Sequence, residues 1–172
     1  MTAPGVRVAW ARDADDLAAL QLADWAERTA GQHVTLPDAV EVASAWRSSL
    51  TQPGDARLRV LVALDEDRIV GYAVVGPDPD PDAAPAHDAQ LAELAVAPAA
   101  RRRGHGSRLL HACVDTWTAD GFDRATAWVD TGDEPRRRFL TAAGWQPDGA
   151  HRELADAGGA TVRQVRLHTA LT

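Results

Sequence analysis

The stretch Val96–Leu110 reads VAPAARRRGHGSRLL and lies where a predicted strand passes into a predicted helix. The apolar run Leu91–Val96 indicates the strand, and Ser107–Ala119 indicates the helix, because its apolar residues recur at helical spacing. Between them, three arginines precede two glycines that are one residue apart, in a chain with a formal net charge of -7. Positive charge is therefore concentrated at a flexible corner directly before a helix start.

This corner has the features of an anion-binding site. Gly104 and Gly106 remove side chains where a backbone can approach a ligand closely. The free N–H groups and the dipole of the following helix add partial positive charge, and Arg101, Arg102 and Arg103 add full charges. We therefore expect a polyphosphate or pyrophosphate site. The alternative is a solvated arginine cluster beside a glycine turn, which the flanking strand and helix disfavour.

Two better-known phosphate motifs do not fit the corner. The chain has no lysine, which excludes the lysine-containing nucleotide loop and lysine chemistry in general. The dinucleotide pattern needs a third glycine, and none follows Gly106 at the required spacing. The corner therefore belongs to some other class of phosphate site.

Length and composition limit the classes of protein to consider. The 172 residues fit a single domain over residues 1–172, and 45% hydrophobic and 25% charged residues are ordinary for a globular protein. No apolar run is long enough for a membrane span, and no secretory signal is visible, so we expect a cytoplasmic protein without membrane partners. The single cysteine, Cys113, excludes a disulfide framework and a multi-cysteine zinc site, and we expect it in the core. The acidic balance argues against nucleic acid as a partner.

The rest of the chain alternates between helix and strand patterns. Predicted strands are Arg7–Trp10, Leu58–Leu64, Ile69–Val75, Leu91–Val96, Ala125–Val129, Trp145–Leu154 and Thr161–His168. The first predicted helix begins at the N-cap Asp13, and Pro37 and Asp38 open the second. Two further helices are predicted over Ser107–Ala119 and Glu134–Ala143. The loop Gly76–Asp88, GPDPDPDAAPAHD, has no packing signature, and we interpret its aspartates as solubilising charge, with attraction of cationic amines as the alternative.

Strand, proline and the pattern Arg101-x-x-Gly104-x-Gly106 opening a helix together resemble the GCN5-related N-acetyltransferases. The segment Glu134–Trp145, EPRRRFLTAAGW, is similar to a later helix of that family that ends in glycine and an aromatic residue. The order of elements also matches over nearly the whole chain. The resemblance implies an α/β (α+β) fold in one domain: a mixed, mostly antiparallel sheet of about six to seven strands with splayed central strands, flanked by about four helices.

The resemblance implies acetyl-CoA as the co-substrate and no metal. Its pyrophosphate would lie on the amides of residues 102–107, its pantetheine arm along Leu94–Val96, and its thioester oxygen near the N–H of Ala95 or Val96. The implied cofactor-binding residues are Leu94, Ala95, Val96, Arg101, Arg102, Arg103, Gly104, His105, Gly106, Ser107, Asp133, Arg136 and Phe139. Arg137 and Arg138 could also reach phosphates, or face solvent.

Amine attack on a thioester needs a base, and Glu93 on the cofactor strand is the first candidate. The alternative for Glu93 is a solvent-facing carboxylate or one paired with an arginine. His87 and Asp88 are weaker candidates, and His105 suits a backbone or phosphate-side role better. The family often carries a tyrosine that protonates the leaving thiolate, and Leu140 stands at that position.

Two further features bear on function. The only tyrosine is Tyr72, on an earlier strand, and Asp133 stands where the family often has a helix-capping asparagine. We therefore expect an N-acetyltransferase acting on an amine of a small molecule or of a peptide or protein N-terminus, as a possible homodimer. The alternative is a non-catalytic acyl-CoA-binding or regulatory domain. The acceptor would be framed by the first two helices and the final hairpin, around Trp25, His33 and the loop Ala155–Ala160.

Overall fold

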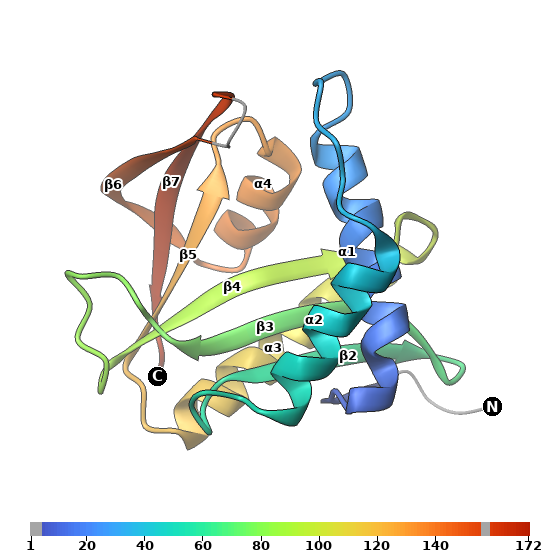
Figure 1. Ribbon diagram of the computed structural model, residues 1–172. Helices are drawn as coiled ribbons and strands as arrows, with labels where there is room; N and C mark the ends of the chain where they lie inside the picture. The colour runs from blue at the N-terminus through green and yellow to red at the C-terminus, as the bar shows by residue number, and fades with distance from the viewer. Residues whose placement is uncertain (1–4, 156–158) are drawn as a thin grey trace. The chain divides into compact units, whose positions relative to one another are not determined.

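The computed structural model describes residues 5–155 and 159–172, and its element order is the predicted alternation (Figure 1). The strands are β1 Gly5–Val8, β2 Arg59–Asp65, β3 Arg68–Pro77, β4 Asp88–Val96, β5 Arg124–Asp130, β6 Gln146–Ala155 and β7 Thr161–Ala170. The α-helices are α1 Ala14–Arg28, α2 Ala39–Thr51, α3 His105–Ala119 and α4 Glu134–Ala142, with 3-10 turns η1 Ala11–Asp13 and η2 Pro98–Ala100.

The strands form one seven-stranded sheet in the order β1-β2-β3-β4-β5-β7-β6. The pairs β1–β2, β2–β3, β5–β7 and β6–β7 are antiparallel, and β4 pairs with β5 in parallel. The β4–β5 register joins Asp88–Gln90 to Arg124–Thr126, at the beginning of each strand. This mixed, mostly antiparallel sheet with its helices confirms the predicted fold class.

Contacts divide the chain into two compact units. The first unit comprises Met1–Gly76 and Glu93–Thr116, and the second comprises Pro77–Ala92 and Trp117–Thr172. The predicted corner and Glu93 both belong to the first unit.

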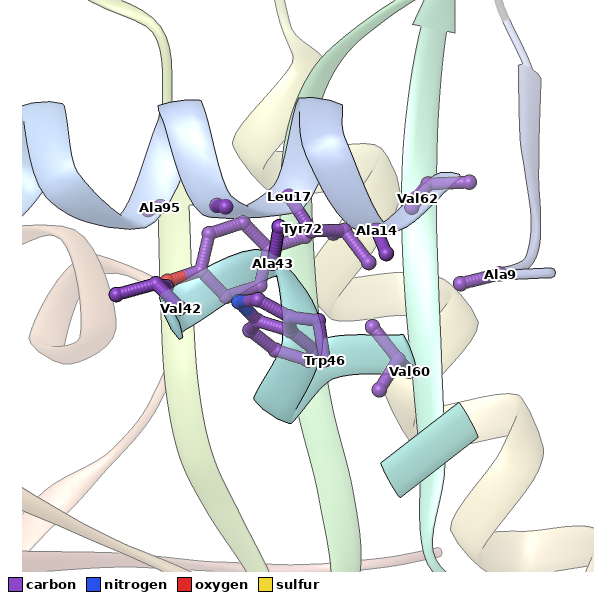
Figure 2. Close-up of a cluster of buried hydrophobic side chains, with 11 residues drawn as sticks. Ala9, Ala14, Leu17, Val42, Ala43, Trp46, Val60, Val62, Tyr72 and Ala95 are labelled. Atoms are coloured by element: carbon purple, nitrogen blue, oxygen red, sulfur yellow. The ribbon is translucent and has the colours of Figure 1, made fainter. Parts of the chain in front are cut away.

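In the first unit, α1 and α2 pack on one face of β2 and β3 (Figure 1). Val60 and Val62 are two residues apart on β2, so their side chains point to the same face of the sheet. Leu17 of α1 belongs to the same buried cluster. Figure 2 shows the rings of Trp46 and Tyr72 at the centre of this cluster, edge to face with centroids 5.5 Å apart. Burying each such aromatic ring contributes about 1.5–3 kcal/mol.

The opposite face of β2 and β3 is covered by α3. A Cβ on Gly71 would lie 2.8 Å from the carbonyl oxygen of Ala95 and 3.3 Å from Cδ1 of Leu109. Only glycine therefore allows β3, β4 and α3 to approach one another so closely at this point. Cys113 is buried in this helix, as predicted, and burial raises the pKa of its thiol to about 12.

The caps of the first two helices differ in a way that the sequence did not reveal. α2 begins directly after Asp38, as predicted, and the side chain of Asp38 caps it by accepting the N–H of Val40 at 2.8 Å. Asp13 occupies the N-cap position of α1, but its carboxylate makes no capping hydrogen bond. It accepts instead from Arg7 at 2.7 Å and from the N–H of Trp10 at 2.7 Å. Asp13 bonds to the Arg7 guanidinium and not to the first N–H groups of α1, because charge-assisted hydrogen bonds are stronger than those between neutral groups.

In the second unit, β5, β7 and β6 pair in that order, and α4 lies next to these strands (Figure 1). Trp117 and Trp145 are both buried, with ring centroids 6.3 Å apart. α4 ends at Ala142, within one residue of the predicted end, and Gly144, whose φ of 92° suits glycine, follows its C-cap Ala143.

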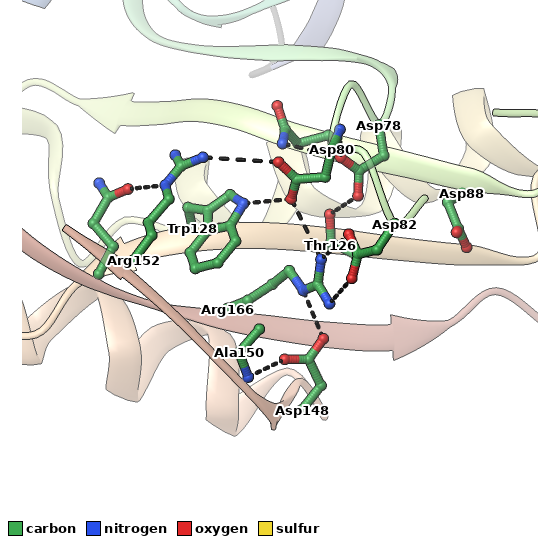
Figure 3. Close-up of polar contacts among 12 residues, drawn as sticks. Asp78, Asp80, Asp82, Asp88, Thr126, Trp128, Asp148, Ala150, Arg152 and Arg166 are labelled. Carbon is green, nitrogen blue, oxygen red and sulfur yellow. Dashed lines mark hydrogen bonds and ion pairs between the residues drawn. The ribbon is translucent and has the colours of Figure 1, made fainter. Parts of the chain in front are cut away.

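The loop after β3 is packed, which corrects its interpretation as loosely solvated, solubilising charge. Asp78 is 2% exposed and accepts the hydroxyl of Thr126 at 2.6 Å. Asp80 accepts the indole N–H of Trp128 at 2.6 Å (Figure 3). The aspartates are therefore hydrogen-bond acceptors for β5.

Arg166 of β7 forms ion pairs with aspartates of the same loop and with Asp148. Its guanidinium donates to both oxygens of Asp82 at 2.8 Å and to Asp148 at 2.7 Å, and it lies 3.4 Å from Asp80 (Figure 3). The hydrogen bond to Asp82 is the largest cause that raises the pKa of Arg166, against the opposing effect of burial. The same contact lowers the pKa of Asp82. We call Asp80, Asp82, Asp148 and Arg166 the arginine strap.

Candidate active site

The corner between β4 and α3 has the backbone conformation of an anion site. Arg102 and Gly104 have φ values of 63° and 82°, in the left-handed region. The N–H of Arg108 donates to the carbonyl of Gly104 at 3.0 Å, as the first helical hydrogen bond of α3. The N–H groups of residues 105–107 therefore precede it and lie at the positive end of the helix dipole. These are the groups predicted to bind a pyrophosphate.

Arg108 braces this corner. Its Nη2 donates to the carbonyl of Arg103 at 3.0 Å and lies 3.0 Å from Nδ1 of His105. A Cβ on Gly104 would lie 3.0 Å from Nη1 of Arg108, in addition to the strain of a positive φ. Arg108 was not among the predicted site residues, because an arginine inside a helix matches no motif.

The side chain of His105 is turned inward. It is 2% exposed, and since a guanidinium can only donate, Nδ1 accepts from Arg108 and Nε2 carries the proton. Burial lowers the pKa of His105, Arg108 lowers it further, and Asp65, 3.9 Å from Nε2, opposes them. The imidazole is therefore neutral at pH 7, and only the backbone N–H of His105 is left for a ligand.

The three arginines have different partners. Arg101 donates to Glu27, at the end of α1, at 2.7 Å. Arg103 pairs with Asp65 at 2.8 Å. Arg102 is exposed and forms no ion pair within the part of the chain that the structure describes. Its charge is the one not already balanced by a carboxylate.

The end of β4, predicted to carry the pantetheine arm, is fixed by hydrogen bonds to Arg101 and to Val70 of β3. Leu94 and Val96 are half-buried, and Ala95 is buried. The Nε of Arg101 donates to the carbonyl of Val96 at 3.0 Å, and the N–H of Ala97 donates to Val70 at 2.8 Å. The peptide groups beside the corner are thus fixed in place.

Glu93, the predicted base, is half-buried on β4 and is hydrogen-bonded by two neutral side chains. Nε2 of Gln21 lies 3.1 Å from both carboxylate oxygens, and the hydroxyl of Tyr72 donates to Oε2 at 2.6 Å. The indole N–H of Trp46 donates in turn to Oε1 of Gln21 at 2.9 Å. The alternative of a Glu93–arginine pair is not what these contacts show.

Sequence reasoning missed the partners of Glu93. Trp46 lies four residues from both Val42 and Leu50, a spacing that indicates only an apolar helix face, and Tyr72 stood out only as a tyrosine on an earlier strand. Gln21 lies four residues after Leu17 and four before Trp25, on the same apolar stripe of α1. A lone amide on a buried stripe was the available signal, because a buried polar group needs a partner.

The acetyltransferase (GNAT) family model matches residues 19–145, which include the corner and Glu93. The chain belongs to the GNAT family.

Curated and solved relatives agree with this assignment. The phosphinothricin N-acetyltransferase of Streptomyces coelicolor is 31% identical over 121 residues, 70% of this chain and 69% of that protein. The mycothiol acetyltransferase of Mycolicibacterium smegmatis is 38% identical over 88 residues, 51% of this chain but only 26% of that protein. A GNAT phosphinothricin acetyltransferase from Sinorhizobium meliloti, solved in complex with AcCoA, has a TM-score of 0.73 at 22% identity, over 99% of this chain and 89% of that one. The protein is therefore an acetyltransferase by family.

The remaining predicted GNAT cofactor residues lie around α4 in the second unit. Asp133 caps this helix by accepting the N–H of Arg136 at 3.1 Å, and the Nε of Arg136 lies 3.2 Å from its carboxylate. Phe139 is half-buried. Leu140 is 1% exposed, so at the position where the family often has tyrosine this GNAT protein has a core residue.

Arg137 and Arg138 bond within α4 and the turn before it. Arg137 donates to the carbonyl of Thr131 at 3.3 Å, and Arg138 pairs with Glu134 at 2.7 Å. Both side chains are largely exposed.

The weaker base candidates have partners of their own. His87 contacts Asp123, and Asp88 pairs with Arg124 at 3.1 Å, all in the second unit. Neither lies in the contact network of Glu93.

Of the predicted acceptor frame, Trp25 is half-buried and His33 is exposed, while residues 156–158 of the loop lie outside the described residues. A pocket on the β6–β7 hairpin is lined by Thr131, His151, Arg152, Glu153, Arg163 and Gln164. In residues 5–155 and 159–172, no cluster of three metal-ligating side chains occurs. No helix in those ranges is long and apolar enough to cross a membrane.

Proposed function

We propose that this GNAT protein transfers the acetyl group of acetyl-CoA to an amine of a small molecule or of a peptide N-terminus. The observation that carries the proposal is the corner, where left-handed Arg102 and Gly104 precede three helix-start N–H groups. A pyrophosphate requires such a convergence of donors and positive charge.

The donor would be held mainly by backbone. The N–H groups of residues 105–107 and the guanidinium of Arg102 are the groups suited to the pyrophosphate. The peptide groups of Leu94–Val96 suit the pantetheine arm and the developing oxyanion. Arg101 and Arg103 support the corner through their carboxylate partners. Asp133, Arg136 and Phe139 stay in the proposal as further cofactor residues, without a metal.

Glu93 is the proposed base. An ammonium must lose a proton before its nitrogen can attack the thioester carbonyl, and Glu93 accepts that proton, directly or through a water. The new bond joins the amine nitrogen to the acetyl carbon, the carbon–sulfur bond breaks, and the acylated nitrogen loses its second proton to water. CoA leaves as a thiolate that takes a proton from water, since Leu140 offers none.

The names of two relatives support a choice of acceptor. One relative is named for phosphinothricin and another for mycothiol, so a small molecule is the first acceptor to test. The net charge of -7 argues against a nucleic-acid partner. A single functional domain over residues 1–172, a homodimer and a cytoplasmic location stay predictions.

Leu140 favours one alternative, a domain that binds acyl-CoA without turnover. It is buried and apolar where a proton donor often stands, so a chain that had lost its chemistry could retain the corner alone. The intact network around Glu93 favours the enzyme.

Amine-dependent release of CoA thiol from acetyl-CoA, with mass spectrometry of the acetylated amine, tests the proposal. The panel is phosphinothricin, a primary alkylamine and a peptide with a free N-terminus. We expect turnover with at least one amine. Binding of CoA without turnover on any amine would favour the non-catalytic alternative.

A further inference from the structure

We propose that Gln21, Trp46 and Tyr72 are positioning residues that fix the Glu93 carboxylate in one orientation for proton transfer. The proposal rests on the proposed function, because it gives these residues a role only if Glu93 is the base. All four residues lie in the first unit, on α1, α2, β3 and β4.

The orientation of the Gln21 amide follows from Trp46. An indole N–H can only donate, so the atom of Gln21 that faces Trp46, at 2.9 Å, must be its oxygen. The amide nitrogen then points to Glu93, 3.1 Å from both oxygens. Trp46 thus acts on Glu93 through one intervening side chain. Without the indole N–H, the amide could turn and present its oxygen to the carboxylate, which would repel it.

The network is buried enough to hold this arrangement. Gln21 and Trp46 are each 8% exposed, and Tyr72 is fully buried. The ring of Tyr72 meets that of Trp46 edge to face, so its hydroxyl is directed by packing. Side chains whose rotamers are locked in this way lose no further freedom when the carboxylate acts.

The distribution of donors distinguishes the two oxygens of Glu93. Oε2 accepts from both Tyr72 and Gln21, whereas Oε1 accepts only from Gln21 among the described residues. A carboxylate has about four lone-pair positions, so Oε1 retains more capacity to accept a proton. We infer that Oε1 is the oxygen that receives it.

This arrangement also gives the single tyrosine a role other than that of the missing acid. The hydroxyl of Tyr72 already donates to Glu93, and its side chain is enclosed by the helices that cover β3. Tyr72 therefore supports the base and does not replace the proton donor that Leu140 lacks.

The test uses conservative variants with a matched control. Gln21→Met, Trp46→Phe and Tyr72→Phe each remove a hydrogen bond but keep most of the packing. Trp117→Phe removes another buried indole N–H, one that has no partner among the described residues. Each variant is made in the wild-type protein and again in Glu93→Gln, and kcat and KM are measured with acetyl-CoA and the best amine of the panel.

In the wild-type background, we expect Trp46→Phe and Gln21→Met to lower kcat roughly 10- to 100-fold with the KM for acetyl-CoA nearly unchanged. Trp117→Phe should keep kcat. In the Glu93→Gln background, the same substitutions should have little further effect, because they act only through Glu93. Losses of equal size in both backgrounds, or an unchanged kcat, would overturn the inference while leaving the acetyltransferase proposal intact. No turnover by the wild type with any amine would overturn both.

Discussion

At the scale of single residues, Glu93 carries the chemistry that we propose, and its contacts separate that role from cofactor binding. Its hydrogen-bond partners come from α1 and β3, whereas the corner that would hold the pyrophosphate is built by residues 102–107. Glu93→Gln keeps the shape of the side chain but removes its ability to accept the proton. We therefore expect turnover to fall by roughly 100-fold and the KM for acetyl-CoA to change little.

The dependence on pH sharpens this prediction. As pH rises, free amine accumulates in solution and the need for a base decreases, so the deficit of Glu93→Gln should shrink. Rates measured from pH 6 to pH 10 on both proteins check it. A variant with the wild-type rate throughout would remove Glu93 from the mechanism.

His105 makes a prediction about stability. Burial lowers the pKa of His105 in the folded protein below its ordinary value of 6.5. Below that pH the unfolded chain binds a proton that the folded chain does not, so stability falls as pH falls. His105→Gln keeps an acceptor for Arg108 but does not titrate. Thermal unfolding should therefore show a smaller drop in Tm from pH 7 to pH 5.5 for the variant.

Two aspartates whose pKa is lowered, Asp13 and Asp148, lose their stabilising effect outside this pH range. The pKa of Asp13 is lowered, mainly by the hydrogen bond from Arg7, and its stabilisation is lost only as pH falls below its ordinary value of 3.8. The pKa of Asp148 is lowered as well. Burial raises it, but the hydrogen bonds from Ala150 and Arg166 together outweigh that effect. Equal drops in Tm for the wild type and His105→Gln would show that the imidazole is not neutral in the fold.

At the scale of elements, the arginine strap attaches the loop after β3 to β7. Arg166→Leu leaves Asp148 partly buried without its cation, whereas Asp80 keeps its ion pair with Arg152 at 3.8 Å. Breaking the Arg166–Asp148 pair in this way costs about 3 kcal/mol. We expect a lower Tm and faster hydrogen exchange in residues 77–88. Arg163→Leu is the matched control, three residues away on β7, where an exposed pair with Glu153 contributes about 0.5 kcal/mol or less. Similar losses in the two variants would show that the strap is no stronger than a surface ion pair.

This loop shows where sequence reasoning stops. Strands and helices were predicted to within a few residues because their apolar periodicity is local, and Gly144 and Asp38 mark helix ends by local chemistry. The partner of Asp82 is Arg166, 84 residues later in the chain, and no local sequence pattern predicts such a pair. Acidic side chains next to prolines therefore looked solvated until the fold placed a cation among them.

The candidate site divides in the same way. Its backbone part was predictable, because the two glycines, the three arginines and the flanking strand and helix are neighbours in the sequence. Its side-chain part was predictable only for Glu93, which lies on the same strand as the motif. Gln21, Trp46 and Tyr72 come from three other elements and reach Glu93 only in the folded chain. Their roles depend on tertiary contacts that spacing does not encode.

At the scale of the whole molecule, the family match runs through residues 19–145 and so includes parts of both units. The fold and the family thus agree with the sequence motif. Beyond the family, we propose that CoA binds at the corner before α3. This claim can be tested without knowing the acceptor.

The most direct measurement is calorimetric titration of CoA into the wild type, Gly106→Glu and Gly54→Glu, with circular dichroism to confirm folding. Gly106→Glu places a side chain and a negative charge at the start of α3, whereas a Cβ at Gly54 meets nothing within 4 Å. We expect Gly54→Glu to bind CoA like the wild type. We expect a folded Gly106→Glu to lose at least about 100-fold in affinity, which corresponds to about 2.7 kcal/mol of binding free energy. A folded Gly106→Glu protein that binds CoA as tightly as the wild type would contradict the account.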